Sequence, residues 1–135
     1  MQKKLRYITL ITALFLSYSA MSAEILEQGL IGKWQGMRDT ASKCQFLAWN
    51  SSFMPNGKFE ITFFSNKERT EKINTEHGSW KASNGKNELT TDGVPTPEIY
   101  LYTLIDNDTV KYVNTVKDPS ADCQDDYEFT EHSVK

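Results

Sequence analysis

Short runs in which apolar and polar residues alternate make up most of the chain after its first 30 residues. In the run at residues 57–65, Phe59, Ile61 and Phe63 share one face of an extended strand, and charged and polar residues share the other face. A period of two is typical of a β-strand with one buried and one solvated face. The run therefore predicts a strand whose inward face is aromatic.

The same alternation recurs toward the C-terminus. Val110, Tyr112 and Val116 repeat it, although a polar residue interrupts the pattern before its last member. Tyr127 and Phe129 repeat it again near the end of the chain. The chain holds 16 aromatic residues among its 135, which is a large share for a domain of this size. We therefore expect the interior to be rich in aromatic side chains.

Eight such runs follow one another, separated by turn residues. They cover residues 31–38, 44–53, 57–65, 70–82, 87–92, 98–105, 109–116 and 124–132. Two of the turns contain Asn-Gly pairs, which supply the positive backbone angles that a tight hairpin needs. Many short strands at even spacing predict an all-β fold: an antiparallel up-and-down barrel, or a strongly curved sheet, of about eight strands. We expect Trp34 and Trp80 to point inward.

Residues 1–23 have the layout of a secretory signal peptide. Three basic residues come first, the apolar run "YITLITALFL" follows, and small residues end the segment. The apolar run is too short to span a bilayer. We therefore expect an exported protein, periplasmic or secreted and of bacterial type. Residues 24–135 would form a single domain, beginning with a short helical turn at 24–30.

Without the predicted signal peptide the chain carries 12 basic and 18 acidic side chains, a formal charge of −6. Such a chain repels phosphate backbones and anionic lipids, so nucleic acid is a poor partner. Acidic residues concentrate near the C-terminus. Asp118, Asp122, Asp125 and Asp126 are therefore candidates for binding a basic partner protein, and the alternative is a solvated acidic surface that aids solubility.

The chain has two cysteines, Cys44 and Cys123, and both lie in the part expected to be exported. An oxidising compartment makes one disulfide the default. A bond between them would close a long loop, which the chain-entropy model values at roughly 4 kcal/mol. A zinc pair is a weaker interpretation, because neither cysteine has a second ligand at metal-binding spacing.

Three short motifs carry a resemblance to a known family. Gly32-Lys33-Trp34, the hairpin "MPNGKF" at 54–59 and "HGSWKASNGKNEL" at 77–89 resemble the motifs of short bacterial lipocalin-like (calycin-type) domains. The resemblance implies a barrel whose first tryptophan closes the floor and whose cup can hold one small apolar ligand. The ligand would then lie against Trp34, Trp49, Phe63 and Tyr112. An interior filled by its own side chains is the equal alternative.

No set of residues points to catalysis, because a nucleophile, a base and an orienting group do not come together in the sequence. The two histidines, His77 and His132, are expected on the surface. The carboxylate pairs Glu68/Glu71 and Asp125/Asp126 stand in polar stretches with no sign of burial. The segment at 118–126 could bind calcium weakly, but it lacks the glycine and the final glutamate of an EF-hand loop. We expect neither an enzyme nor a cofactor.

Two hypotheses for the function follow from the sequence. The first is an exported, non-catalytic binding protein that acts on another protein, as periplasmic inhibitors and immunity proteins do. Its support is the acidic C-terminal segment and a core that aromatic residues could fill. The alternative is a lipocalin-like carrier of a small hydrophobic ligand, which requires a cavity inside the barrel.

Overall fold

A computed structural model describes residues 26–38, 44–116, 123 and 127–135. Eight strands follow a single-turn 3-10 helix, η1 (Gln28–Leu30). The strands are β1 (Gly32–Arg38), β2 (Leu47–Phe53), β3 (Lys58–Phe64), β4 (Lys72–Ser83), β5 (Lys86–Thr91), β6 (Glu98–Asp106), β7 (Thr109–Asn114) and β8 (Glu128–Ser133). Each pairs with the next in antiparallel fashion, and β8 pairs with β1 to close a barrel. The predicted all-β fold is confirmed.

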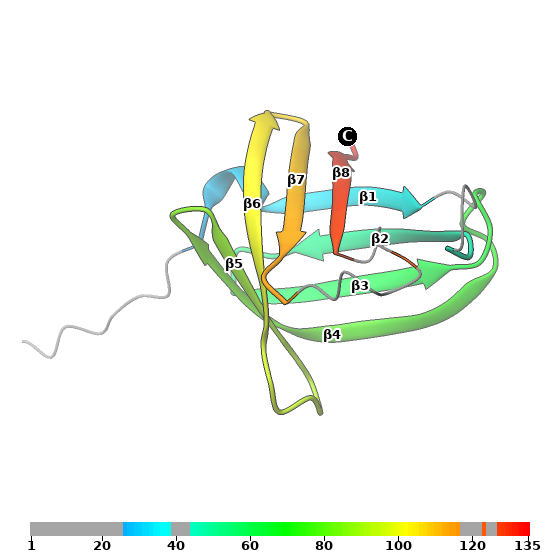
Figure 1. Cartoon of the computed structure of the whole chain (residues 1–135), viewed down its shortest axis with the longest axis horizontal. Coiled ribbons are helices and arrows are strands. Elements are labelled where there is room, and N and C mark those ends of the chain that lie inside the picture. The colour runs from blue at the N-terminus through cyan, green and yellow to red at the C-terminus, as the bar shows by residue number, and fades with distance from the viewer. Residues whose placement is uncertain (1–25, 39–43, 117–122, 124–126) are drawn as a thin grey trace, which may run out of the picture.

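Figure 1 shows two strand directions in the barrel: β1 to β4 run across the view, and β6 to β8 cross in front of them. Closure depends on a short contact, because β1 and β8 share only three register pairs, from Trp34 with Ser133 to Gly36 with Glu131. The β4–β5 hairpin turns through Asn84 and Gly85, whose φ angles are 52° and 80°. Such angles suit an Asn-Gly pair, as the sequence predicts.

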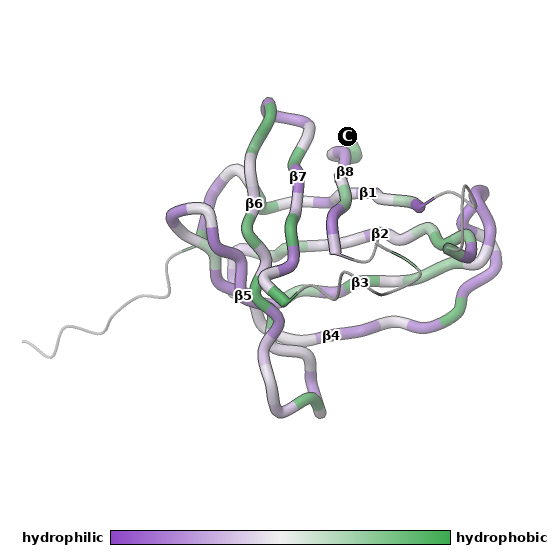
Figure 2. Tube along the Cα trace, in the orientation of Figure 1, coloured by the Kyte–Doolittle hydropathy of each residue, from purple (hydrophilic) through white to green (hydrophobic). Residues whose placement is uncertain are grey.

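Alternate residues of every strand point into the barrel. Phe59, Ile61 and Phe63 do so on β3, as predicted, with Phe59 fully buried and the other two half-buried. In Figure 2 hydrophobic and hydrophilic positions interchange along the strands accordingly. Val116 departs from the prediction: β7 ends at Asn114, and the Val116 side chain is 76% exposed because it lies beyond the strand.

One end of the barrel is filled by side chains. Trp34, Phe53, Phe59 and Trp80 are each at most 3% exposed there, and Leu30 of η1 is fully buried against them. This end is where β1 begins and β2 ends, so η1 lies directly beneath it. The two tryptophans point inward, as expected. Each donates its indole N–H to a backbone carbonyl: Trp34 to Leu30 at 2.9 Å, and Trp80 to Met54 at 3.0 Å. We call this half the closed end.

The opposite end is held by the disulfide. Cys44, just before β2, bonds to Cys123, just before β8, across a sequence separation of 79 residues. The predicted disulfide is confirmed. It ties together the two segments that enter the strands on either side of β1.

The first strand is preceded by the 3-10 helix where a helical turn was expected. The predicted signal peptide, residues 1–23, lies outside the described residues. Within the described part of the chain, no helix has the length and apolar character to cross a membrane.

Candidate functional site

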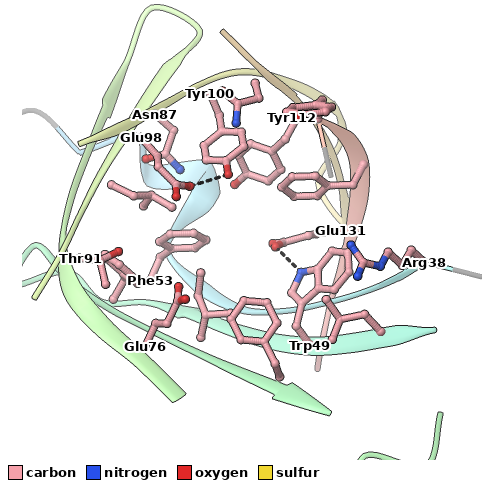
Figure 3. A pocket seen from close by; sticks show the side chains of 18 residues that line it. Arg38, Trp49, Phe53, Glu76, Asn87, Thr91, Glu98, Tyr100, Tyr112 and Glu131 are labelled. Atoms are coloured by element: carbon pink, nitrogen blue, oxygen red, sulfur yellow. Dashed lines mark hydrogen bonds between the residues drawn. The ribbon is translucent and has the colours of Figure 1, made fainter. Parts of the chain in front are cut away.

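The half of the barrel away from the closed end is hollow. A cavity of about 340 Å³ lies there, bounded by inward-facing residues of all eight strands. Phe53, Phe59 and Leu89 form its inner end, where it meets the core, and Leu47 and Phe63 lie toward the other end. The volume falls at the lower end of the range for small-molecule sites. Figure 3 shows the side chains that surround it. We call this half the hollow end.

A glycine allows the central contact of the cavity wall. Gly36 of β1 pairs with Trp49 of β2 on one side and with Glu131 of β8 on the other. A Cβ atom at Gly36 would lie only 2.7 Å from the Trp49 Nε1 atom, so no other residue fits there without displacing the indole. Because β1 presents no side chain at this position, the side chains of its two neighbours meet across it. Trp49 Nε1 donates to Glu131 Oε1 at 2.9 Å.

Glu131 is a buried carboxyl group, only 3% exposed. Its Oε1 atom also accepts a hydrogen bond from the Ser51 hydroxyl at 2.9 Å, whereas Oε2 has no partner. Burial disfavours the ionised form and raises the pKa of Glu131 to about 7, although the bonds from Trp49 and Ser51 act in the opposite direction. Near neutral pH, Glu131 can therefore be either a hydrogen-bond donor or a buried negative charge.

Two further polar groups in the cavity wall lack hydrogen-bond partners. Asn87 on β5 is fully buried, and neither its amide nitrogen nor its amide oxygen is bonded. The Tyr112 hydroxyl on β7, on a side chain 2% exposed, is also unbonded. The Asn87 amide lies near enough to the phenol to favour its ionised form, yet the two form no hydrogen bond of acceptable geometry. Buried polar groups in native proteins are normally satisfied, so these three residues have atoms free to hydrogen-bond to water or to another molecule in the cavity.

Two more carboxyl groups, those of Glu76 and Glu98, line the cavity. Glu98, at the start of β6, accepts a hydrogen bond of 2.6 Å from the Tyr100 hydroxyl. Glu76 of β4 is half-buried, and its pKa is raised by burial and, to a lesser extent, by the charge of Glu98. Figure 3 shows Glu76 and Glu98 on the wall opposite Glu131, with all three directed toward the same space.

Arg38, at the end of β1, is the one basic residue among the described side chains that line the cavity. Its Nε atom donates to the Gln45 carbonyl at 2.9 Å, which holds the guanidinium at the rim. The cavity thus combines an aromatic lining with three carboxyl groups and one cation.

The structure places three of the four predicted ligand-binding residues at this cavity. Trp49, Phe63 and Tyr112 line it, while Trp34 belongs to the closed end and does not. The predicted partner-binding residues Asp118, Asp122, Asp125 and Asp126 lie outside the described residues, so the partner hypothesis stays a prediction.

The residues considered for catalysis lie apart from the cavity. His77 and His132 are exposed, as expected, and His77 Nδ1 lies 3.5 Å from the Glu60 carboxylate on the outer surface. Glu68 and Glu71 are exposed as well. Among the described residues, no group of three or more His, Cys, Asp or Glu side chains could hold a metal ion.

Sequence reasoning missed the polar residues of the cavity. Glu131 lies in the acidic C-terminal part of the chain, but it points inward because it follows Phe129 by two residues on β8. Glu76, Asn87 and Glu98 share a face with Trp80, Leu89 and Tyr100 in the same way. The period of two that predicts the inward apolar positions also predicts that these polar residues point inward, because they lie an even number of positions away on the same strands.

Comparison with known proteins assigns no family to this barrel and its cavity. Neither the protein-family models nor the curated protein sequences contain a match to this chain.

Proposed function

We propose that this protein is an exported, lipocalin-like binding protein that holds one small molecule inside its barrel. The observation that carries the proposal is the cavity of about 340 Å³ in which Asn87, Tyr112 and Glu131 present unbonded polar atoms among aromatic rings. A mostly apolar cavity with a few convergent polar groups is the usual form of a small-molecule site. The eight-stranded barrel, with Trp34 of the Gly-x-Trp motif buried at its closed end, agrees with the lipocalin-like resemblance of the sequence.

Export is supported by the signal-like first 23 residues and by the disulfide, which suits an oxidising compartment. In such a compartment a stable, disulfide-linked barrel can act as a carrier or a scavenger of its ligand. The described residues of the cavity suit binding, because they supply aromatic surface and hydrogen-bonding groups around one space inside the barrel.

The test is the binding of N-phenyl-1-naphthylamine, a neutral apolar fluorophore, to the oxidised protein. We expect saturable binding with a stoichiometry of one. Ile61→Trp should abolish it by filling the cavity that Ile61 lines, whereas Thr103→Trp on the outer face of β6 should leave it unchanged. Mass spectrometry under native conditions, on protein taken from its own source, should show a co-purifying small mass. If the fluorophore fails to bind and no small mass co-purifies, the proposal is wrong.

A further inference from the structure

The lining of the cavity specifies the charge of its ligand, if the proposed binding function holds. Three carboxyl groups, from Glu76, Glu98 and Glu131, share the space with a single guanidinium, that of Arg38. Arg38 donates to the Gln45 carbonyl, and its single positive charge is outnumbered by the three carboxyl groups of the lining. The interior is therefore short of positive charge.

The Tyr100 hydroxyl lies within electrostatic reach of all three acids. Burial and the hydrogen bond to Glu98 raise the pKa of Tyr100 well above its ordinary value, and the charges of Glu98, Glu76 and Glu131 raise it further. The negative charges of the three acids, on β4, β6 and β8, thus all affect the Tyr100 hydroxyl. A cation placed near that hydroxyl would be attracted by each of them, most weakly screened by water at the buried Glu131 and most strongly at the exposed Glu98.

The wall beside this point is aromatic. The Phe129 ring contacts three others: its centroid lies 5.4 Å from that of Trp49, 5.7 Å from that of Tyr100 and 5.3 Å from that of Tyr112. Aromatic faces attract cations and pack against flat apolar groups. A cavity with an aromatic wall and three carboxyl groups in its lining is suited to a ligand that has both a cationic and an apolar part.

The unbonded polar atoms give the second, independent indication. The Glu131 Oε2 atom, the Tyr112 hydroxyl and the Asn87 amide are at least nine-tenths buried and have no partner among the described residues. Each has an oxygen that can accept a hydrogen bond, and the Asn87 amide nitrogen is an unpaired donor as well. A primary ammonium group, which carries three donors and no acceptor, would satisfy the oxygens. A carboxylate ligand would instead place a negative charge against Glu131 and the two other acids.

We propose that the cavity selects a protonated amine joined to a flat apolar body, with the ammonium group near the Tyr100 hydroxyl, where the charges of Glu76, Glu98 and Glu131 attract it. The apolar body lies against the rings of Trp49, Tyr100 and Phe129. The ligand class is thus organic amines, in contrast to fatty acids and other apolar anions.

The experiment compares three ligands of one shape: 2-(1-naphthyl)ethylamine, its alcohol 2-(1-naphthyl)ethanol and the acid 1-naphthylacetate. Calorimetry at pH 7.5 measures their affinities for the oxidised, full-length mature protein. We expect the amine to bind about tenfold more tightly than the alcohol, and the acid to bind most weakly. Glu131→Gln, Glu76→Gln and Glu98→Gln should each reduce the preference for the amine. Glu60→Gln, on the outer face of β3, is the matched control and should leave it intact.

The outcomes separate this inference from the proposed function. Equal binding of the three ligands, tightest binding of the acid, or a preference for the amine that survives all three cavity variants would overturn the amine assignment and leave small-molecule binding in place. Failure of all three ligands, together with failure of N-phenyl-1-naphthylamine, would contradict the binding function itself. Glu76→Gln and Glu98→Gln keep the test informative if Glu131→Gln does not fold.

Discussion

The two ends of this barrel are built from the same kinds of residue but differ in how their polar atoms are satisfied. At the closed end, Trp34 and Trp80 bond to backbone carbonyls and the rings pack together; Phe53 lies 5.1 Å from Trp80 between ring centroids. At the hollow end, Trp49 bonds instead to the buried Glu131, and an oxygen of that carboxyl group faces the cavity without a partner.

This difference indicates that the two ends of one sheet have different roles, one in stability and one in the proposed binding. The closed end buries its apolar area completely, so it supplies most of the stability. The hollow end leaves space and holds polar groups at a cost in stability, which is typical of residues placed for binding. The predictions below test this contrast, beginning with the largest expected effect.

Phe59 and Phe63 form a matched pair, because they lie on one face of β3, four residues apart, at opposite ends of the barrel. Phe59 is 1% exposed, while Phe63 is half-buried at the cavity. We expect Phe59→Ala to lower the free energy of unfolding by about 3–5 kcal/mol, because it leaves a hole in a filled core. Phe63→Ala should cost about 1 kcal/mol, since the half-buried ring loses less buried apolar area than the fully buried Phe59 ring does. Urea denaturation measures both, and equal losses would contradict the contrast.

The disulfide lies at the hollow end, but it should stabilise the whole domain. Replacing both cysteines, Cys44→Ser with Cys123→Ser, should lower the free energy of unfolding by roughly 4 kcal/mol, because the 79-residue separation closes a long loop in the unfolded chain. The same loss should follow from reduction of the native protein, which serves as the control. Unchanged stability after both treatments would show that the bond does not constrain the unfolded chain.

Glu131 should make the stability depend on pH. Its pKa is about 7 in the folded protein against an ordinary value of 4.5, so the folded state binds a proton more tightly than the unfolded state does. The contribution of the neutral carboxyl group is therefore complete below pH 4.5 and is lost as the pH rises through 7. The total loss should be about 3 kcal/mol.

Glu131→Gln is the matched variant for this prediction, because its amide oxygen can still accept from Trp49 and Ser51. Denaturation curves at pH 4.5, 6 and 8 should converge for the two proteins at low pH and separate at high pH, with the variant more stable there. Parallel curves over this range would contradict a raised pKa.

The sequence carries most of the fold in its local pattern. Alternation located the eight strands to within a few residues, the Asn84-Gly85 turn adopts the expected angles, and the cysteine pair bonds as expected. These features depend on neighbours in the chain. The contact between Trp49 and Glu131 does not: it joins residues 82 positions apart across a third strand, and it exists because that strand has a glycine there. No local sequence pattern predicts a contact between residues so far apart in the chain.

Gly36→Ala tests that explanation with a smaller change. The added Cβ would displace the Trp49 indole and break its bond to Glu131, so we expect a loss of about 1–3 kcal/mol in unfolding free energy and weaker fluorophore binding. Gly29→Ala is the control, since the nearest group there is the flexible Leu104 side chain. If Gly36→Ala binds the fluorophore as tightly as the native protein, the glycine is not needed for the cavity.

The most direct test of the division between the two ends uses the three indole N–H groups as reporters within one protein. Trp34 and Trp80 report on the closed end, and Trp49 reports on the cavity. In a nitrogen-labelled sample, with resonances assigned through Trp→Phe variants, N-phenyl-1-naphthylamine is added to saturation. We predict that the Trp49 indole resonance shifts strongly while those of Trp34 and Trp80 stay close to their original positions. An unmoved Trp49 resonance, or equal shifts of all three, would contradict a filled closed end and a binding cavity in the other half.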